Sequence, residues 1–398
     1  MSFTTSRRMK AFEQSIFAEL SQLKKMRIAE GEKIIDLSIG SPDLPPPKFL
    51  MDAISKDALN PAAYGYSLTG TEEFQESVRT YYKKNHNVSL NTKNEIIQLM
   101  GSQDGLVHFP MVLCNPGDYI LVPDPGYTAY ATGASMSGAE LYPMPSRKET
   151  GFLPELNNIP EDILHKAKLM ILNFPGNPVP AMVTRKYFEE AIAVAKKYKI
   201  VILHDFAYSE LYYGEKPLSF LAVEGAKDVG IEMNSLSKSF NMAGCRVAYA
   251  AGNPDLIEKL AQLKSNLDYG VFLPVQNAAA KALIAESNFL QSNREIYKAR
   301  RDVLISGLEQ IGWHVDIPQA SMFIWAEIPQ GFSSSKEFSI ELLHKANVVV
   351  TPGNAFGRYG EGYVRIALVQ PEAELLKAVK SIADSSLFNK KASDRRRI

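Results

Sequence analysis

One lysine of this chain stands among small hydroxyl residues, in the segment from Asn234 to Phe240, which reads NSLSKSF. Arg246 follows Lys238 by eight residues, and the strand-like run from Val229 to Met233 precedes the segment. A lysine among serines at the end of a buried strand is an unusual choice for structure alone. It suits an amine that lies beside a bound phosphate and forms a Schiff base with an aldehyde. We therefore expect Lys238 to be the reactive group.

The elements that would position Lys238 alternate between short apolar runs and helical patterns. Strands are predicted at residues 95–100, 119–122, 168–173, 200–203 and 229–233, and helices at 105–113 and 184–199. This alternation favours an α/β fold with a mostly parallel sheet covered by helices. In such sheets functional residues gather at the carboxyl ends of strands. Four polar segments fall at such ends: Gly101 to Gln103, Asn173 to Asn177, Asp205 to Tyr208, and Ser235 to Lys238.

The last hundred residues follow a different pattern. A helix is predicted at 297–311, short strands at 313–317, 322–328, 348–350 and 363–368, and a closing helix at 372–383. This segregation indicates a smaller α+β domain. The proline-rich stretch from Pro42 to Pro47 is expected to cross from an N-terminal arm into the large domain. We expect the arm and part of the small domain at 1–46, the large domain at 47–285, the small C-terminal domain at 286–390, and a disordered basic tail at 391–398.

Two of the strand ends could bind a phosphate together. Backbone N–H groups at the start of a helix favour an anion, and Ser102 would add a hydroxyl. An ordinary N-cap would explain Ser102 equally well. Arg246 could converge on the same phosphate with the hydroxyls of Ser235 and Ser237, because arginine binds phosphate through paired donors. A structural ion pair is the alternative for Arg246.

Asp205 follows an apolar strand, where an unpaired carboxylate would be costly. It needs a cationic partner, and a protonated pyridine nitrogen would serve, which would make that ring an electron sink. A helix cap or an ion pair would also explain the residue. Tyr208 could donate to a phenolate oxygen of the ring, or be an ordinary half-buried tyrosine. His204 is interpreted as a structural histidine.

Composition and charge exclude several classes of function. Lys+Arg and Asp+Glu number 44 each in 398 residues, so the net charge is zero and nothing favours nucleic acid or an anionic membrane. The two cysteines, Cys114 and Cys245, cannot build a disulfide framework, and the six histidines show no metal-ligand spacing. The sequence has no signal-peptide pattern and no apolar run of about 18 residues. We therefore expect a cytoplasmic protein without a metal.

Four motifs, taken together and in this order, resemble a known family. They are Asn173 to Pro178 (Asn-Pro element), Asp205 to Tyr208 (Asp-x-x-Tyr), Ser235 to Lys238 with Arg246 (Ser-x-Ser-Lys-x7-Arg), and Tyr363 to Leu368 around Arg365. From about Phe12 to the last helix, the chain resembles the pyridoxal-phosphate-dependent aminotransferases of class I and II, which have fold type I. The resemblance implies a large domain with a mostly parallel sheet between helices, and a smaller α+β domain.

The resemblance implies a role for each matching position around the cofactor ring. Lys238 would hold the cofactor as a Schiff base and then move a proton between the substrate Cα and C4′ of the cofactor. Asp205 would pair with the pyridine nitrogen. Asn177 and Tyr208 would bond the phenolic oxygen of the ring, and Tyr127 would stack on its face.

Further positions would bind the phosphate and the substrate. The phosphate would be bound by Ser102, Gln103, Ser235, Ser237 and Arg246. Arg365 would bind the α-carboxylate of an amino acid or a 2-oxo acid, helped by Asn177 and by the backbone at Ile39 and Gly40. Tyr66, or else Tyr64, would reach the phosphate of a neighbouring subunit, which implies a homodimer with shared active sites.

One departure from the family concerns the loop after Asn177. The family reads Asn-Pro-Thr-Gly where this chain has Asn177-Pro178-Val179-Pro180. The turn thus lacks a hydroxyl and the freedom of glycine, and Pro180 restricts Val179 to extended conformations. Asn177 is kept, so we expect the loop shape to change more than the chemistry.

The choice of substrate is the least determined point. The chain looks most like the branch with alanine–glutamate and LL-diaminopimelate aminotransferases, on four segments: 101–105, 204–208, 267–270 and 320–325. No second arginine for a distal carboxylate is evident, so alanine or another small neutral amino acid, with 2-oxoglutarate as acceptor, is the lead. An LL-diaminopimelate aminotransferase is the alternative, and so is a C–S β-lyase. A cofactor-sensing regulator would need a DNA-binding segment, and a phosphate-binding protein would form no Schiff base.

Overall fold

The computed structural model describes residues 3–6, 9 and 16–388. The predicted basic tail at 391–398 lies outside the described residues. Within them, no helix has the length and apolar character needed to cross a membrane.

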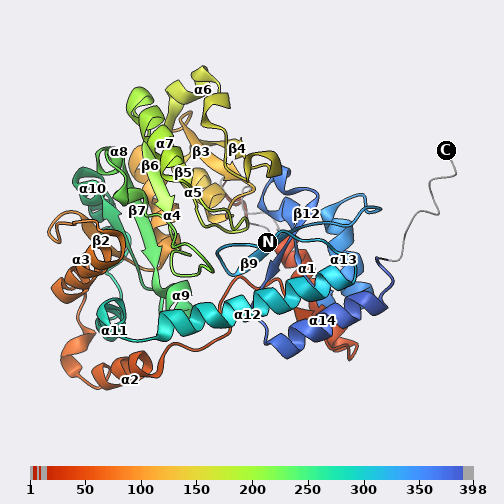
Figure 1. The fold of residues 1–398 in the computed structure, drawn as a ribbon. Helices are drawn as coiled ribbons and strands as arrows, with labels where there is room; N and C mark the ends of the chain where they lie inside the picture. The colour runs from red at the N-terminus through yellow and green to blue at the C-terminus, as the bar shows by residue number, and fades with distance from the viewer. Residues whose placement is uncertain (1–2, 7–8, 10–15, 389–398) are drawn as a thin grey trace.

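A seven-stranded sheet forms the larger part of the molecule (Figure 1). Its order is β2 (Ile96–Leu99), β8 (Ala248–Gly252), β7 (Gly230–Ser235), β6 (Val201–Asp205), β5 (Ala167–Leu172), β3 (Tyr119–Asp124) and β4 (Glu140–Pro145). β8 runs antiparallel to both of its neighbours, whereas the pairs from β7 to β4 are all parallel. The predicted α/β architecture with a mostly parallel sheet is confirmed.

Helices cover both faces of this sheet because its central strands are apolar on both sides. Leu169 and Ile171 of β5 join the core beneath α4 (Ser102–Leu113), α5 (Ala129–Ser137) and α10 (Pro254–Lys264). The alternate residues Met170 and Leu172 join the opposite core, beneath α3 (Glu72–His86), α7 (Arg185–Tyr198) and α11 (Leu273–Ile284). Successive side chains of a strand point to opposite faces, so a continuous apolar run supplies two cores. The short helices α2 (Lys48–Asp57), α6 (Glu161–Lys166), α8 (Ala226–Val229) and α9 (Leu236–Ser239) complete this part.

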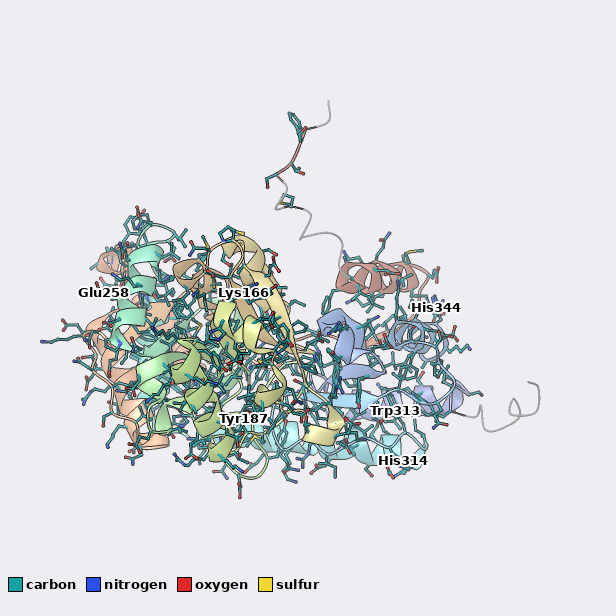
Figure 2. All side chains as sticks on the ribbon, turned by 90° about the horizontal axis from the view of Figure 1, so that it is seen from above. Lys166, Tyr187, Glu258, Trp313, His314 and His344 are labelled. Carbon is teal, nitrogen blue, oxygen red and sulfur yellow. The ribbon has the colours of Figure 1, made fainter. Side chains whose placement is uncertain are left out.

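A smaller α+β part has its own core. Its antiparallel sheet has the order β11 (Thr351–Pro352), β12 (Tyr363–Ala367) and β9 (Phe323–Glu327), and β1 (Ile35–Asp36) pairs with β10 (Val348–Val349). The helices α1 (Ile16–Ala29), α12 (Phe289–Gln310), α13 (Ser335–Ala346) and α14 (Glu372–Asp384) lie around it. Figure 2 shows the two parts side by side, with Glu258 and Tyr187 in the larger and Trp313 and His344 in the smaller.

The predicted strand at 313–317 is wrong. Trp313 is buried against Phe338, and its Nε1 donates to the Glu327 carbonyl at 2.8 Å. The next apolar residues gain less cover, and Ile317 is 58 % exposed. The alternation of apolar and polar residues at 313–317 thus reflects the burial of Trp313 alone. The backbone of this segment pairs with no described strand.

The helix α12 connects the two parts (Figure 1). At its start Phe289 stacks on Phe240, which follows α9, with ring centroids 6.1 Å apart. Further along, Tyr297 and Leu304 lie in the core of the smaller part. Arg300 on the same helix forms two hydrogen bonds with Asp43, in the proline-rich crossing. The domain boundaries near residues 46 and 285 stay predictions.

Candidate active site

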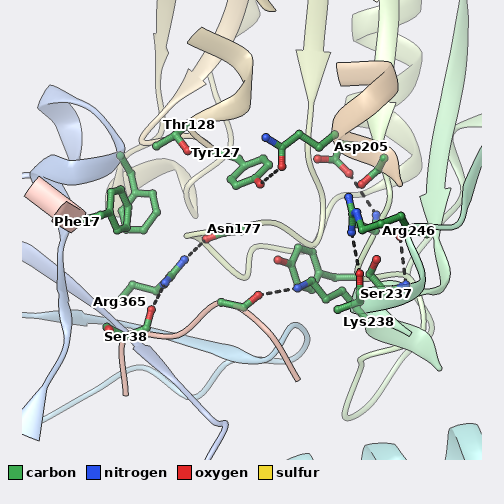
Figure 3. A pocket seen from close by; sticks show the side chains of 18 residues that line it. Phe17, Ser38, Tyr127, Thr128, Asn177, Asp205, Ser237, Lys238, Arg246 and Arg365 are labelled. Atoms are coloured by element: carbon green, nitrogen blue, oxygen red, sulfur yellow. Dashed lines mark hydrogen bonds between the residues drawn. The ribbon is translucent and has the colours of Figure 1, made fainter. Parts of the chain in front are cut away.

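A cavity of about 340 Å³ lies between the two parts, at the carboxyl ends of the parallel strands (Figure 3). Twelve of the predicted site residues line it: Gly40, Ser102, Gln103, Tyr127, Asn177, Asp205, Tyr208, Ser235, Ser237, Lys238, Arg246 and Arg365. Ile39 and Tyr66 do not, and both side chains are exposed. The predicted strand ends therefore meet at one place, which no single motif could establish.

Lys238 enters the cavity from the short helix α9, directly after β7. The Ser235 hydroxyl oxygen caps this helix by accepting from the Ser237 N–H at 3.1 Å. The Lys238 Nζ donates to the Gly40 carbonyl at 2.5 Å, across to the N-terminal segment. Burial, helped by the charges of Arg365 and Arg246, lowers the pKa of Lys238 to about 8. Near physiological pH a far larger share of this amine is therefore neutral and nucleophilic than for a lysine with the ordinary pKa of 10.5.

The lowered pKa of Lys238 predicts the pH dependence of the rate at which the protein forms a Schiff base with an aldehyde. Only the neutral amine attacks a carbonyl, so the rate of covalent attachment should rise with pH through about 8 and then level off. Stopped-flow absorbance of the cofactor-free protein mixed with pyridoxal phosphate measures this rate. A midpoint near 10.5, the ordinary value for lysine, would contradict the environment described.

The start of α4 and Arg246 present their donors at the same place. Gly101 precedes the helix with φ +82°, and a Cβ added there would lie 2.2 Å from Arg246 Nη2. Glycine thus lets the guanidinium approach the exposed N–H groups at the helix start, next to Ser102. Arg246 forms no ion pair with any described residue and donates within the chain to the Ala243 carbonyl. Both features suit an anion such as phosphate.

Asp205 ends β6 and is almost fully buried at the bottom of the cavity. One carboxylate oxygen accepts from the Tyr130 hydroxyl at 3.0 Å, and the other accepts from the Ala207 N–H at 3.3 Å. Burial raises its pKa, against the lowering effect of these hydrogen bonds. It forms no ion pair with any described residue, so a cationic group from a ligand would be stabilised there.

Arg365 on β12 is buried on the opposite side of the cavity. Its Nη1 donates to Asn177 Oδ1 at 2.8 Å and its Nη2 to the Ser38 carbonyl at 2.6 Å. The guanidinium also lies over the rings of Phe323 and Phe356, at 4.4 and 4.8 Å from their centroids. Burial lowers its pKa to about 10, so it remains charged at neutral pH. A buried guanidinium that contacts only neutral acceptors suits an incoming carboxylate.

The loop from Asn173 to Pro180 keeps Asn177 in position despite its unusual sequence. Asn173 donates to the Asp205 carbonyl at 2.7 Å, and its own Oδ1 accepts from the Asn177 N–H at 2.9 Å. Val179 is buried and packs with Trp325 and Phe356. The hydrophobic contact of Val179 thus anchors the turn where the family has a hydroxyl and a glycine.

Some lining residues were missed by the sequence reasoning. Ser38 and Phe356 contact Arg365, and Phe17 packs on Phe356. Thr128 lies beside Tyr127 (Figure 3), and the Tyr130 hydroxyl donates to Asp205. Tyr130 stands one helical turn after Tyr127, so its position relative to a predicted site residue was a usable signal. Thr128 and Ser38 are direct neighbours of the predicted residues Tyr127 and Ile39, so the same signal was available for them. Phe17 and Phe356 belong to segments that reach the cavity only through the tertiary fold.

Tyr64 and Tyr66 lie outside the cavity of their own chain. Tyr66 is 84 % exposed, and its ring lies on Tyr269 with centroids 4.9 Å apart. Tyr64 packs on Phe272, and its hydroxyl donates to the Ala58 carbonyl at 2.9 Å. The hydroxyl of Tyr64 is thus already bound within the chain, which favours Tyr66 as the side chain that extends outward.

No group of metal-ligating side chains occurs in the part of the chain that the structure describes. The cavity instead combines one buried carboxylate with three cationic side chains, Lys238, Arg246 and Arg365. The sequence model of the family "Aminotransferase class I and II" matches residues 32–382. The chain belongs to the class I and II aminotransferases.

Relatives of this aminotransferase match over nearly their whole length. The LL-diaminopimelate aminotransferase of Syntrophobacter fumaroxidans is 42 % identical over 382 residues, which are 96 % of this chain and 98 % of the relative. That of Aquifex aeolicus is 41 % identical over 387 residues, 97 % of this chain and all of the relative. The substrate-bound structure of BacF from Bacillus subtilis has a TM-score of 0.91 at 38 % identity, covering 96 % of this chain and 98 % of that one.

The enzyme depends on pyridoxal phosphate, and the cavity fits that cofactor. The phosphate would face the anion site formed by the start of α4 and Arg246, where Gly101 leaves room for the guanidinium. The pyridine nitrogen would face Asp205, a buried carboxylate whose partners within the chain are neutral. The aldehyde would face Lys238, whose pKa is lowered to about 8. The excess of cationic side chains is consistent with a phosphate and a carboxylate bound together.

Proposed function

We propose that Lys238, Asp205 and Arg365 carry the reaction of this aminotransferase. The bound cofactor supplies an electron sink for the electrons left when the substrate Cα loses its proton. The observation that supports these assignments is the cavity itself, which brings together twelve predicted residues from distant segments.

Each side chain would do one job in this reaction. Lys238 Nζ binds the cofactor covalently, and once the substrate amine has displaced it, it moves a proton from the substrate Cα to C4′ of the cofactor. Asp205 holds the proton on the pyridine nitrogen, with Tyr130 fixing its carboxylate. Arg365 binds the substrate α-carboxylate, and Asn177 orients the guanidinium. Tyr208 and Asn177 would bond the phenolic oxygen of the ring, and Tyr127 would stack on its face.

We also infer a homodimer with shared sites in the cytoplasm. Tyr66, Tyr269 and Phe272 are all exposed, and Tyr66 packs on Tyr269. Tyr269 follows Asp268, which shares Lys264 with Asp104 in the first turn of α4, so this exposed aromatic surface supports a second copy binding beside the predicted phosphate site. The two described cysteines are both free, which is in keeping with a reducing compartment.

For the amino donor, we propose LL-diaminopimelate, with 2-oxoglutarate as acceptor. The support is the name shared by relatives that are 40–42 % identical over almost the entire chain. Alanine or another small neutral amino acid is the second candidate, because the cationic side chains that line the cavity are Lys238, Arg246 and Arg365. All three have roles already, so this chain alone offers no described cation for a distal carboxylate.

A donor panel decides between these substrates. The purified enzyme is given LL-diaminopimelate, alanine, aspartate and glutamate in turn, with 2-oxoglutarate or pyruvate as acceptor, and kcat/KM is measured for each. We expect LL-diaminopimelate to give a kcat/KM at least about tenfold above alanine, a difference of roughly 1.4 kcal/mol in transition-state binding. A preference for alanine would support the second candidate. Release of pyruvate and ammonia from cystathionine without an acceptor would instead identify a C–S lyase.

A further inference from the structure

His204 and Glu232 form a fully buried pair behind the active site. They stand directly opposite each other in the register of β6 and β7, and His204 Nδ1 lies 2.8 Å from Glu232 Oε2. The carboxylate also accepts from the Tyr82 and Ser219 hydroxyls, both at 2.8 Å, and from the Phe220 N–H at 2.7 Å. These three donors, apart from His204, are the surroundings of an ionised carboxylate.

The hydrogen bond of the second ring nitrogen of His204 indicates the protonation state of the pair. His204 Nε2 lies 3.1 Å from the Phe174 carbonyl oxygen, which can only accept a hydrogen bond, so Nε2 must carry a proton. Nδ1 faces an ionised carboxylate and must carry a proton too. Burial alone would raise the pKa of Glu232, but the hydrogen bond and the charge of His204 hold it below its usual range. The rings of Phe188 and Phe206 lie 5.1 and 4.8 Å from the imidazole, which also suits a cation.

This pair is connected to the active site through two backbone contacts. The Phe174 carbonyl that accepts from His204 belongs to the loop that ends at Asn177, whose Oδ1 accepts from Arg365. Asp205 is the next residue after His204, and the charge of His204 lowers the pKa of Asp205 against the effect of burial. One imidazole thus holds the loop beside the carboxylate site and lies next to the carboxylate that faces the pyridine nitrogen.

We propose that His204 is a positioning residue: as a buried imidazolium paired with Glu232, it fixes the loop that presents Asn177 to Arg365 and keeps a positive charge behind Asp205. The proposal relies on the role assigned to Arg365 only for its kinetic consequence, because the protonation of His204 is independent of the substrate. The other titratable groups near the pair are His86 and Tyr82 from α3, Tyr249 from β8, Lys216 and Glu210.

Nitrogen NMR of the full-length enzyme with bound pyridoxal phosphate tests the protonation directly. The protein is labelled with ¹⁵N in histidine, and spectra are recorded at pH 7. We expect one of the six histidines to show both ring nitrogens protonated, and Glu232→Gln to remove that state. The signal is assigned by substituting the other five histidines one at a time, so the assignment needs no variant at His204. A His204 with one unprotonated ring nitrogen at pH 7 overturns the proposal.

Kinetics test the positioning role. The double variant His204→Phe with Glu232→Gln removes both charges while nearly keeping the shape, so it avoids an unpaired buried carboxylate. We expect KM for the amino donor to rise about tenfold, as for the loss of one hydrogen bond, with kcat changed less than about threefold. The matched control is His86→Phe, whose imidazole packs on Phe206 in the same cluster and whose Nε2 has no hydrogen-bond partner. Equal changes of KM in both variants, or none in the double variant, would rule out a positioning role.

Discussion

The substitution Lys238→Ala should abolish transamination while the protein still binds pyridoxal phosphate. In the proposed role of Lys238, the variant loses both the covalent attachment and the group that moves the proton. A positioned general base alone contributes about 10²–10⁴-fold to a rate. The anion site around Arg246 and the carboxylate of Asp205 are untouched, so phosphate and ring contacts remain. We therefore expect kcat to fall at least about 10⁴-fold, whereas the affinity for the cofactor should fall far less.

Turnover and cofactor binding are measured separately for this variant. Single-turnover absorbance with excess amino donor reports the chemistry, and equilibrium dialysis reports retention of the cofactor. Lys196→Ala is the control, since Lys196 pairs at the surface with Asp228. Partial recovery of the rate by added methylamine would support the role of an amine at this place. Wild-type turnover in Lys238→Ala would refute the assignment of Lys238.

The second large effect is expected for Asp205→Asn. The amide has the shape of the carboxylate and can still accept from the Tyr130 hydroxyl, but it cannot hold a proton on a pyridine nitrogen by its charge. Losing one such electrostatic contact in a buried site typically costs about 10²–10³-fold in kcat. We expect a loss of this size in turnover with the cofactor still attached to Lys238. Tyr130→Phe, which keeps the charge, should lose much less.

The same variant should be more stable than the wild type when both are free of cofactor. Burial raises the pKa of Asp205 above its ordinary value of 3.8, so the folded state holds its proton more tightly than the unfolded state. Ionised Asp205 therefore lowers the stability of the cofactor-free protein above pH 3.8, and asparagine removes this loss. Thermal unfolding should show a higher midpoint for Asp205→Asn at pH 7, with the difference shrinking as the pH falls toward 3.8. A lower midpoint at pH 7 would contradict this account of Asp205.

The sequence predicted much of the fold and site because the determinants are local. The central parallel strands are mostly apolar and end in polar residues, so β6 with Asp205 and β7, which leads to Lys238, could be located from the sequence alone. Strand ends of a parallel sheet meet at one edge, which explains why these side chains line one cavity.

Other features depend on contacts between distant segments and could not be predicted in this way. Phe17 reaches the cavity from α1 and touches Phe356 from the far end of the chain. The segment after Trp313 alternates like a strand, yet a strand needs a neighbour with free backbone groups. The protonation state of His204 depends on the Phe174 carbonyl and on Glu232, which are 30 and 28 residues away in the sequence.

The N-terminal segment around Ser38 and Gly40 has a consequence for the alternation between two substrates. Its carbonyl groups accept from Arg365 and Lys238, so both cations rest on neutral dipoles of one short stretch of backbone. An arriving carboxylate thus competes with a carbonyl group and does not have to break an ion pair. Such replaceable partners keep the free-energy cost of binding and releasing a carboxylate small. This suits an enzyme that binds and releases a different anion, an amino acid or an oxo acid, in each half of its cycle.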